Sequence, residues 1–346
     1  MSAKPKWRLL RDGITDPNMH FAVEEALLRL TDEQQMMPTL RLRQTEPSVW
    51  IGYYQNAKED VDISFCKQNG LKIVRRMNSG GAVYQDNGTF CYSAFFIKEQ
   101  LFHQWGISKT DDLYRFFGQV VTGLCSKYGI TAELSPVNDI TVNGHKIYGS
   151  AQLEWYSAFM HSGSLLVDAN IEMMQQVLNP GDLKFADKGV KTVRERVSNL
   201  MELTTQITGI NQVMQDFIQV FADLLSVEFE ESGLTAKEQA LADELYREKY
   251  SKPEWTFAAP KQFTTLVSTK IAGGVLTLKC NLLNQTIQSA SIGGDFLISH
   301  HEIIENLMRE WQGKPVREAA KVIPQQNLPE DIAMGLTRLL HQIEEV

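Results

Sequence analysis

Apolar and polar residues alternate along several short segments of the first hundred residues. Such alternation is typical of β-strands, whose side chains point to opposite faces in turn. It predicts strands over 7–11, 39–43, 47–54, 71–76 and 90–97. A loop that contains glycines, residues 77–89, separates the last two of these strands.

Two segments carry apolar residues at helical spacing. Asp16-Pro17-Asn18 is a helix-start signal, and it is followed at helical intervals by Ala22, Ala26, Leu27 and Leu30. Residues 111–128 have one apolar face, made of Leu113, Phe116, Phe117, Val120, Val121, Leu124 and Cys125. Helices and strands in this irregular order predict an α/β or α+β core rather than a helical bundle.

The pattern changes near residue 250. A polar helical segment, 234–249, ends before Ser251-Lys252-Pro253, because proline disfavours helix at the residue before it. The rest favours strands within 263–293, with turns at Gly273-Gly274 and Asn284, and helices over 300–312 and 329–345. We therefore predict a catalytic domain over residues 1–250 and a small α+β C-terminal accessory domain over 255–346.

Composition and charge exclude several classes. The 346 residues are 43% hydrophobic with a net charge of −8, which excludes a disordered chain and argues against a dedicated nucleic-acid binder. No apolar run is long enough to span a bilayer, and residues 1–11 do not resemble a signal peptide. The four cysteines are widely spaced, so neither a zinc site nor a disulfide framework is indicated. We expect a soluble cytoplasmic protein without nucleic-acid or membrane partners.

The first candidate for chemistry is the segment R-R-M-N-S-G-G-A-V-Y-Q-D, residues 75–86. A predicted strand delivers two arginines to a Ser-Gly-Gly turn. Glycines let backbone N–H groups approach an anion closely, and a nearby guanidinium can clamp a phosphate or carboxylate. A plain hairpin with solvated arginines is an equally good interpretation of this segment alone.

The second candidate is N-D-I-T-V-N-G-H-K-I-Y-G-S-A-Q, residues 138–152. Asn143-Gly144 predicts a two-residue hairpin turn. That turn pairs Val142 with His145, Thr141 with Lys146, Ile140 with Ile147 and Asp139 with Tyr148. Asp139, Thr141, Lys146 and Tyr148 then share one face, with Asp139 and Lys146 as diagonal neighbours. A surface salt bridge on a solvated hairpin remains the alternative.

Together the two segments resemble the lipoate–protein ligase family. Its loop reads R-R-x-S-G-G-G-A-V-(Y/F)-H-D, and its lysine hairpin joins N-D-(I/L) to G-x-K-(I/V)-x-G-S-A. Two further matches are H-S-G-S-L-L (161–166) and K-G-V with T-V-R-E-R-V-S-N-L (188–200). The tail from Glu254 resembles the accessory domain of the two-domain ligases. The resemblance covers nearly the whole chain.

The resemblance implies the fold, the reaction and the partners. The fold is the mixed, mainly antiparallel sheet with flanking helices shared with biotin ligases and class II synthetase-like domains. ATP, with Mg²⁺ as its counter-ion, and lipoate give lipoyl-adenylate, with no tightly bound prosthetic group. The lipoyl group then passes to a lysine of an apo lipoyl domain, in 2-oxoacid dehydrogenase complexes or in the glycine cleavage H protein.

The resemblance also implies residue roles. The reaction crowds two anions together, so it needs fixed positive charge, which Lys146 supplies as the catalytic residue in contact with both substrates. The ATP-binding residues are Arg76, Gly81, Ala82, Val83, Tyr84 and Lys146. The lipoate-binding residues are Lys146, Gly80 and His161, although a histidine satisfied within the core is as good an interpretation of His161. Supporting residues are Arg75, Ser79, Asn138 and Asp139, and Asp139 either orients Lys146 or binds magnesium.

Five positions depart from the family pattern. Asn78 and Ser79 replace Ser and Gly, Gln85 replaces His, Thr89 replaces Asn, and Ser162 replaces the second His of a pair. The spacing is unchanged, so the departures affect substrate preference and rate more than fold.

Three other functions remain open. An octanoyl or lipoyl transferase of the same superfamily would need a nucleophilic cysteine just before the lysine hairpin, where this chain has Ser135-Pro136-Val137. The nearest upstream thiol is Cys125, inside a predicted helix. A biotin ligase would need a G-R-G-(R/K)-x-G loop, which is absent. A non-catalytic lipoate-binding paralogue is the third alternative.

Overall fold

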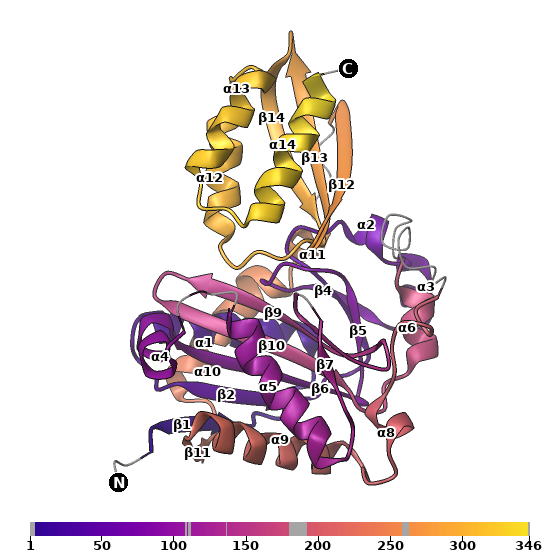
Figure 1. Cartoon of the computed structure of the whole chain (residues 1–346), viewed down its shortest axis with the longest axis vertical. Helices are drawn as coiled ribbons and strands as arrows, with labels where there is room; N and C mark the ends of the chain where they lie inside the picture. The colour runs from indigo at the N-terminus through magenta and orange to yellow at the C-terminus, as the bar shows by residue number, and fades with distance from the viewer. Residues whose placement is uncertain are drawn as a thin grey trace.

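The computed structural model describes residues 4–107, 109, 112–135, 137–179, 192–257 and 263–344. Its centre is an eight-stranded mixed sheet in the order β11-β1-β2-β6-β10-β9-β8-β7 (Figure 1). The strands are β1 Lys6–Leu10, β2 Thr39–Arg43, β6 Thr89–Ile97, β7 Glu133–Leu134, β8 Asp139–Val142, β9 His145–Trp155, β10 Ala158–Leu166 and β11 Glu228–Ser232. Only the β11–β1–β2 pairings are parallel, which confirms the predicted mainly antiparallel sheet with flanking helices.

Helices cover both faces of this sheet. Helix α5 (Asp112–Lys127) and helix α9 (Ile210–Leu225) pack on one face and bury an aromatic-rich core. Helix α1 (Pro17–Asp32), helix α10 (Ala236–Leu245) and the π-helical turn η1 (Tyr246–Tyr250) pack on the other. Asp16 caps α1 as predicted, since its side chain accepts from the N–H groups of Asn18 and Met19.

A second, three-stranded sheet lies on the α1 side. Its order is β4-β3-β5, with β3 Ser48–Ile51, β4 Lys72–Arg75 and β5 Val83–Gln85. It packs in a separate core with the short helices α2 Ala57–Asp60, α3 Ile63–Gln68 and α6 Ile171–Val177. The arginine and glycine loop connects β4 to β5, so this sheet carries the first candidate segment.

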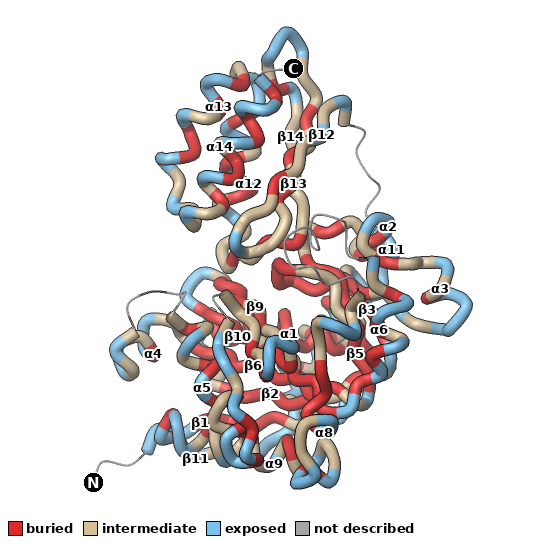
Figure 2. The backbone as a smooth tube through the Cα atoms, turned by 45° about the vertical axis from the view of Figure 1, so that its right-hand side comes forward, coloured by how far each residue is buried: buried red, intermediate tan, exposed pale blue. Residues whose placement is uncertain are grey.

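The C-terminal residues build a further three-stranded sheet with its own core (Figure 2). Its elements are β12 Thr265–Ile271, β13 Gly274–Leu283, β14 Thr286–Gly294, α12 His301–Trp311, α13 Val316–Val322, η2 Ile323–Gln325 and α14 Glu330–Glu344. They follow the predicted tail pattern closely. The domain limits 1–250 and 255–346 remain a prediction.

Several elements differ from the sequence expectation. The polar helix predicted over 234–249 changes from α-helix to π-helix at Tyr246. The 47–54 strand stops at Ile51. The sequence patterns did not predict α9, α4 (Lys98–Trp105), α8 (Leu200–Leu203) or α11 (Pro253–Thr256). No helix within the described part of the chain is long and apolar enough to cross a membrane.

Candidate active site

The lysine hairpin is formed by β8 and β9. Asn143 and Gly144 have φ of 51° and 80°, as a two-residue turn with positive φ at both positions requires. Val142 pairs with His145 and Thr141 with Lys146, as predicted. Beyond them the register shifts between Ile140 and Thr141. A β-bulge therefore interrupts the ladder directly after the lysine.

The bulge corrects two predicted pairs. Ile140 pairs with Tyr148 and Asp139 pairs with Gly149, rather than with Ile147 and Tyr148. Tyr148 consequently does not share a face with Lys146: it is buried in the α5-side core, where its hydroxyl lies 2.8 Å from that of Tyr92. The bulge adds one residue to β9, and a one-residue shift moves a side chain to the opposite face.

Lys146 and Asp139 do meet. Lys146 Nζ lies 2.7 Å from Asp139 Oδ1, and both side chains are about one-third exposed. Gly149 makes room for this pair, because a Cβ atom built there would lie 2.7 Å from Lys146 Nζ and 3.4 Å from Asp139 Oδ1. The ammonium group thus rests directly over the backbone of β9, on the α1 side of the sheet.

The backbone of Lys146 is held by a segment far along the chain. Lys146 N–H donates to Arg196 O (2.7 Å), and Ser198 N–H donates to Lys146 O (3.0 Å), as an isolated parallel bridge to Val197. This segment belongs to the fourth family-like motif, whose Lys188-Gly189-Val190 lies outside the described residues. Sequence reasoning gave no signal for the contact, because it joins two segments that lie far apart along the chain.

Asn138 stabilises the base of the hairpin. Its side-chain amide donates to Ser150 O, while Asn138 O accepts from both the N–H (3.1 Å) and the hydroxyl (3.0 Å) of Ser150. Asn138 therefore fixes the strand that carries Lys146, while its part in the function stays a prediction.

Arg76 is buried and bound to carbonyl groups of its own loop region. Its guanidinium donates to Trp50 O (3.1 Å), Ser79 O (3.0 Å) and Gly81 O (2.8 Å). Burial lowers the pKa of Arg76 to about 10, which leaves it cationic at neutral pH. In this structure the side chain shapes the loop, and contact with a phosphate remains a prediction.

Arg75 connects the segment that follows β3 with the short helix α11. Its guanidinium donates to Gly52 O, Tyr53 O and Gln55 O on one side, and to Trp255 O and Thr256 O on the other. Trp255 returns the contact through its indole N–H to Arg75 O (2.9 Å). Both arginines are therefore buried, which excludes the alternative of a hairpin with solvated arginines, because carbonyl groups replace their hydration.

The C-terminal unit docks on the glycine loop. Ser79 Oγ donates to Ile298 O (2.7 Å) and accepts from Ile298 N–H (2.8 Å), and Gly80 N–H donates to Phe296 O (3.0 Å). Gly80 has φ of 97°, which favours glycine. The Ser79 departure from the family pattern thus has a structural reason, since its hydroxyl satisfies both backbone groups of a residue in the C-terminal unit.

Replacing Ser79 by alanine is expected to lower the free energy of unfolding by about 1–3 kcal/mol, because a buried N–H and a buried C=O lose their partner. Urea denaturation measures the change. Ser126→Ala is the control: Ser126 Oγ also donates to a carbonyl, Thr122 O, but on the surface, and its effect should stay within about 0.5 kcal/mol. Equal effects of the two substitutions would contradict the assignment.

His161 is a core histidine in this structure. It is fully buried, stacks on Phe117 at 4.3 Å, and has Tyr148 Oη and Gln152 Nε2 each 3.2 Å from a ring nitrogen. Burial lowers its pKa to about 3. Its ring lies on the α5 side, whereas Lys146 rests on the α1 side, so the lipoate-contact role stays a prediction without geometric support.

The pKa of His161 is lower in the folded state than in the unfolded chain, where it is about 6.5. The histidine therefore does not change the free energy of unfolding above that pH, and it lowers this free energy increasingly as the pH falls towards 3. The unfolded chain then binds a proton that the folded chain rejects. The free energy of unfolding falls as the pH is lowered from about 6 to about 4, and His161→Gln should make this slope smaller by roughly 1.4 kcal/mol per pH unit. Identical slopes for the variant and the parent would contradict this assignment.

The remaining loop residues lie on or near β5. Gly81, Ala82 and Val83 are half-buried, while Tyr84 packs into the core of the small sheet. Gln85 reaches the large sheet: its Nε2 lies 2.9 Å from Ser164 Oγ, and Ser164 is the register partner of Gly149. Through this contact the strand that follows the glycine loop meets the strand under Lys146.

All four cysteines are buried. Cys125 lies in α5, where burial raises the pKa of its thiol to about 12. Cys91 lies beside Ser164 in the sheet, but it is fully buried, its thiol donates to Gln85 Oε1, and its pKa is raised to about 11. Neither thiol has the exposure or the lowered pKa of a nucleophile.

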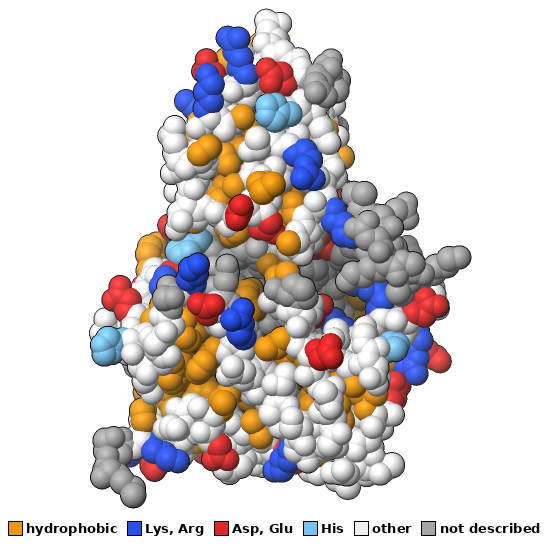
Figure 3. Space-filling view, viewed as in Figure 1, with side chains coloured by type: hydrophobic (Ala, Val, Ile, Leu, Met, Phe, Trp, Pro, Cys, Tyr) orange, Lys and Arg blue, Asp and Glu red, His pale blue; other side chains and the backbone are white. Residues whose placement is uncertain are grey.

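One face of the molecule carries charges of both signs. Lys and Arg side chains are interspersed with Asp and Glu on the face shown in Figure 3. Such mixing gives this face no extended field to attract a polyanion. Within the described parts of the chain, no three His, Cys, Asp or Glu side chains converge to hold a metal ion.

The chain is similar to known proteins in both sequence and structure. The lipoyl protein ligase A/B catalytic domain matches residues 16–222. The lipoate-protein ligase LplJ of Bacillus subtilis is 28% identical over 300 residues, 86% of this chain and 87% of that protein. A bipartite lipoate protein ligase of Thermoplasma acidophilum, studied with its E2 lipoyl domain, has a TM-score of 0.64 and 29% identity, over 76% of this chain and 100% of that one.

A lipoate-protein ligase A bound with ATP has a TM-score of 0.63 and 28% identity, over 74% of this chain and 100% of that one. The family match spans more than half of the chain and includes both candidate segments. The chain therefore belongs to the lipoyl protein ligase A/B family and is a ligase-type member with the fold of the lipoate–protein ligases.

Proposed function

We propose that this chain activates lipoate with ATP, assisted by Mg²⁺, to lipoyl-adenylate, and then transfers the lipoyl group to a lysine of an apo lipoyl domain. The observation that carries the proposal is the ammonium of Lys146 over Gly149, on the sheet face that Gln85 joins to the glycine loop. Similarity to a lipoate-protein ligase A bound with ATP supports ATP as the nucleotide substrate.

The geometry suits the first step. A carboxylate and an α-phosphate repel each other, and a positive group fixed between them lowers the barrier without reorganisation. Asp139 holds the side chain of Lys146, and the bridge to Val197 holds its main chain. Arg76 acts as a positioning residue, since it fixes the carbonyls of Ser79 and Gly81 and thereby the loop.

The second step requires an acceptor lysine to attack the acyl carbon. We propose that positioning dominates this step, because neither the hairpin nor the loop offers a dedicated base. Apo lipoyl domains of 2-oxoacid dehydrogenase complexes are the proposed acceptors, supported by the Thermoplasma ligase and its E2 lipoyl domain. The glycine cleavage H protein is a second acceptor to test.

One experiment separates the ligase from its rivals. The protein is incubated with ATP, Mg²⁺ and lipoate, with and without prior thiol alkylation, and pyrophosphate and the adenylate are measured. A ligase gives both products in either sample, because its buried cysteines take no part. If neither product forms, and if the protein instead transfers an acyl group from a carrier protein and thiol alkylation blocks this transfer, the protein is a transferase. Lipoate binding with no product of either kind would establish the non-catalytic paralogue.

A further inference from the structure

The sheet edge next to the lysine hairpin is open to solvent. Within the described part of the chain, β7 is the last strand of the eight-stranded sheet, and β8 alone separates it from the strand that carries Lys146. Both residues of β7, Glu133 and Leu134, are exposed, and the exposed fraction of Leu134 is 41%. A free sheet edge is a template for contact with another chain.

The main chain of β7 offers hydrogen-bonding groups at this edge. Ser135 N–H donates to Asp139 O (2.9 Å), and the preceding residue, Leu134, is the register partner of Ile140. Successive residues of an antiparallel strand direct their backbone groups to opposite sides. Ser135 therefore faces β8, whereas the N–H and C=O groups of Leu134 point away from the sheet.

Arg115 of α5 adds an unbalanced positive charge beside this edge. Together with Leu134, Ser135 and Asn138 it lines a cavity of about 200 Å³. Arg115 is exposed, and no ion pair joins it to another described residue. Small-molecule sites usually measure roughly 300–1,000 Å³, so a cavity of this size suits one side chain of a partner better than a separate ligand.

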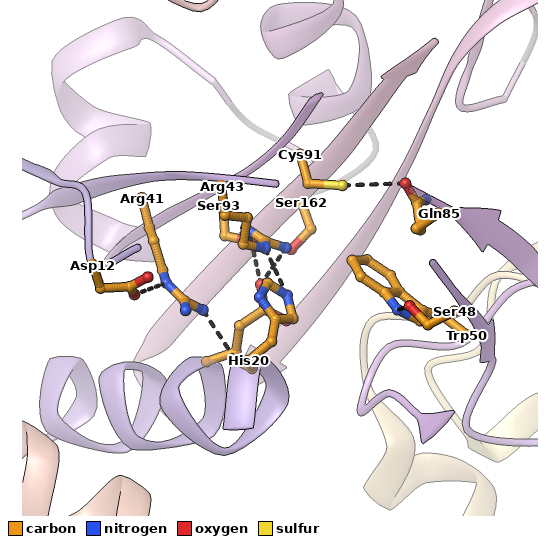
Figure 4. Close-up of polar contacts among 11 residues, drawn as sticks. Asp12, His20, Arg41, Arg43, Ser48, Trp50, Gln85, Cys91, Ser93 and Ser162 are labelled. Atoms are coloured by element: carbon orange, nitrogen blue, oxygen red, sulfur yellow. Dashed lines mark hydrogen bonds and ion pairs between the residues drawn. The ribbon is translucent and has the colours of Figure 1, made fainter. Parts of the chain in front are cut away.

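The arginines within the large sheet differ from Arg115. Figure 4 shows Arg41 bonded to Asp12, whose Oδ2 accepts from Arg41 Nε at 2.6 Å. Arg43 Nη2 lies 2.7 Å from Glu24 Oε1. Buried carboxylates neutralise both of these guanidinium groups, whereas the charge of Arg115 is left to attract an acidic group from another molecule.

We propose that Arg115, Leu134 and Ser135, which we call the β7 edge surface, dock the apo lipoyl domain that accepts the acyl group. An acidic side chain of the domain pairs with Arg115, and its backbone and apolar groups contact Leu134. This inference rests on the proposed function and names the surface that its second step uses.

The position of the β7 edge surface suits acyl transfer. Strand β7 lies two strands from β9, a distance of roughly 10 Å. A partner at a sheet edge has access to both faces of the sheet. The same domain can therefore contact Arg115 on the α5 side and extend its acceptor lysine over β8 to Lys146 on the α1 side.

The test uses the full-length protein and a purified apo E2 lipoyl domain. Isothermal titration calorimetry measures the Kd of the domain, and pyrophosphate release without the domain measures adenylation. Arg115→Glu should raise the Kd by at least about tenfold, because it sets an anion against the acidic group of the partner. Adenylation should stay within about twofold of the parent, because this exposed side chain has no part in that step. An unchanged Kd, or a parallel loss of adenylation, would overturn the inference.

Arg317→Glu is the matched control for charge. Arg317 of α13 is also exposed and has no ion pair with a described residue, but it lies in the C-terminal unit. Its substitution should leave the Kd unchanged. Leu134→Asp should weaken binding as well, whereas Leu224→Asp at the end of α9 should not, although the two leucines are 41% and 42% exposed. Equal effects of each variant and its control would overturn the inference.

The outcomes separate this inference from the proposed function. A parent protein that releases pyrophosphate but binds no lipoyl domain would overturn the docking surface and leave adenylation intact. A parent protein that binds the domain through Arg115 but releases no pyrophosphate would retain the docking surface and overturn the proposed adenylation.

Discussion

Lys146→Ala is expected to lower the rate of adenylate formation by at least about a hundredfold, because the anions then meet without the positive charge at β9. The free energy of unfolding should change by less than about 1 kcal/mol, since the ion pair with Asp139 is about one-third exposed on both sides. Pyrophosphate release measures the first quantity and urea denaturation the second.

Lys127→Ala provides the control for charge. Lys127 is also a part-exposed lysine paired with an aspartate, Asp216, but it lies at the end of α5. Its substitution changes the net charge equally and should leave adenylation unaffected. If Lys146→Ala retained full activity, or if it lost activity only in proportion to lost fold, Lys146 would have no catalytic role.

Gly149→Ala is expected to reduce adenylation by roughly tenfold to a hundredfold while the protein remains folded. The new methyl group would lie within 3 Å of Lys146 Nζ and Cε, so the flexible end of the lysine must move away from its place over β9. Small displacements of a catalytic group are costly in rate, whereas moving a part-exposed side chain costs little stability. Steady-state kinetics measure the expected loss of adenylation rate, and thermal melting measures the expected retention of stability.

Gly233→Ala is the matched control, because no atom lies within 4 Å of the corresponding Cβ position and Gly233 has no left-handed backbone. It should leave both activity and melting temperature close to those of the parent. Retention of full activity in Gly149→Ala would show that the observed position of the ammonium is not the one used in catalysis.

The sequence predicted the elements whose signals are local. The Asn143-Gly144 turn, the cap at Asp16 and the apolar face of α5 are encoded by neighbouring residues, and the structure has each of them. The meeting of Lys146 and Asp139 followed from the same turn. Local reasoning succeeds here because the physical cause lies within a few residues of its effect.

The features that were missed depend on contacts between distant segments. The β-bulge directly after Lys146 on β9 accompanies the bridge from Lys146 to Val197, and no periodicity in residues 138–152 predicts that bridge. The burial of Arg75 and Arg76 likewise requires carbonyl groups from other strands and from Trp255. A pair of arginines before glycines gives the same pattern in a solvated hairpin, so sequence alone leaves the choice open.

Arg75 has a consequence for any attempt to produce the protein as two separate polypeptides. One guanidinium serves carbonyls of Gly52, Tyr53 and Gln55 together with those of Trp255 and Thr256. A cut placed before Pro253 would assign these acceptors to different molecules and turn an intramolecular clamp into a bimolecular one. The short helix α11 therefore belongs with the larger fragment, and a productive division of the gene has to come after Phe257.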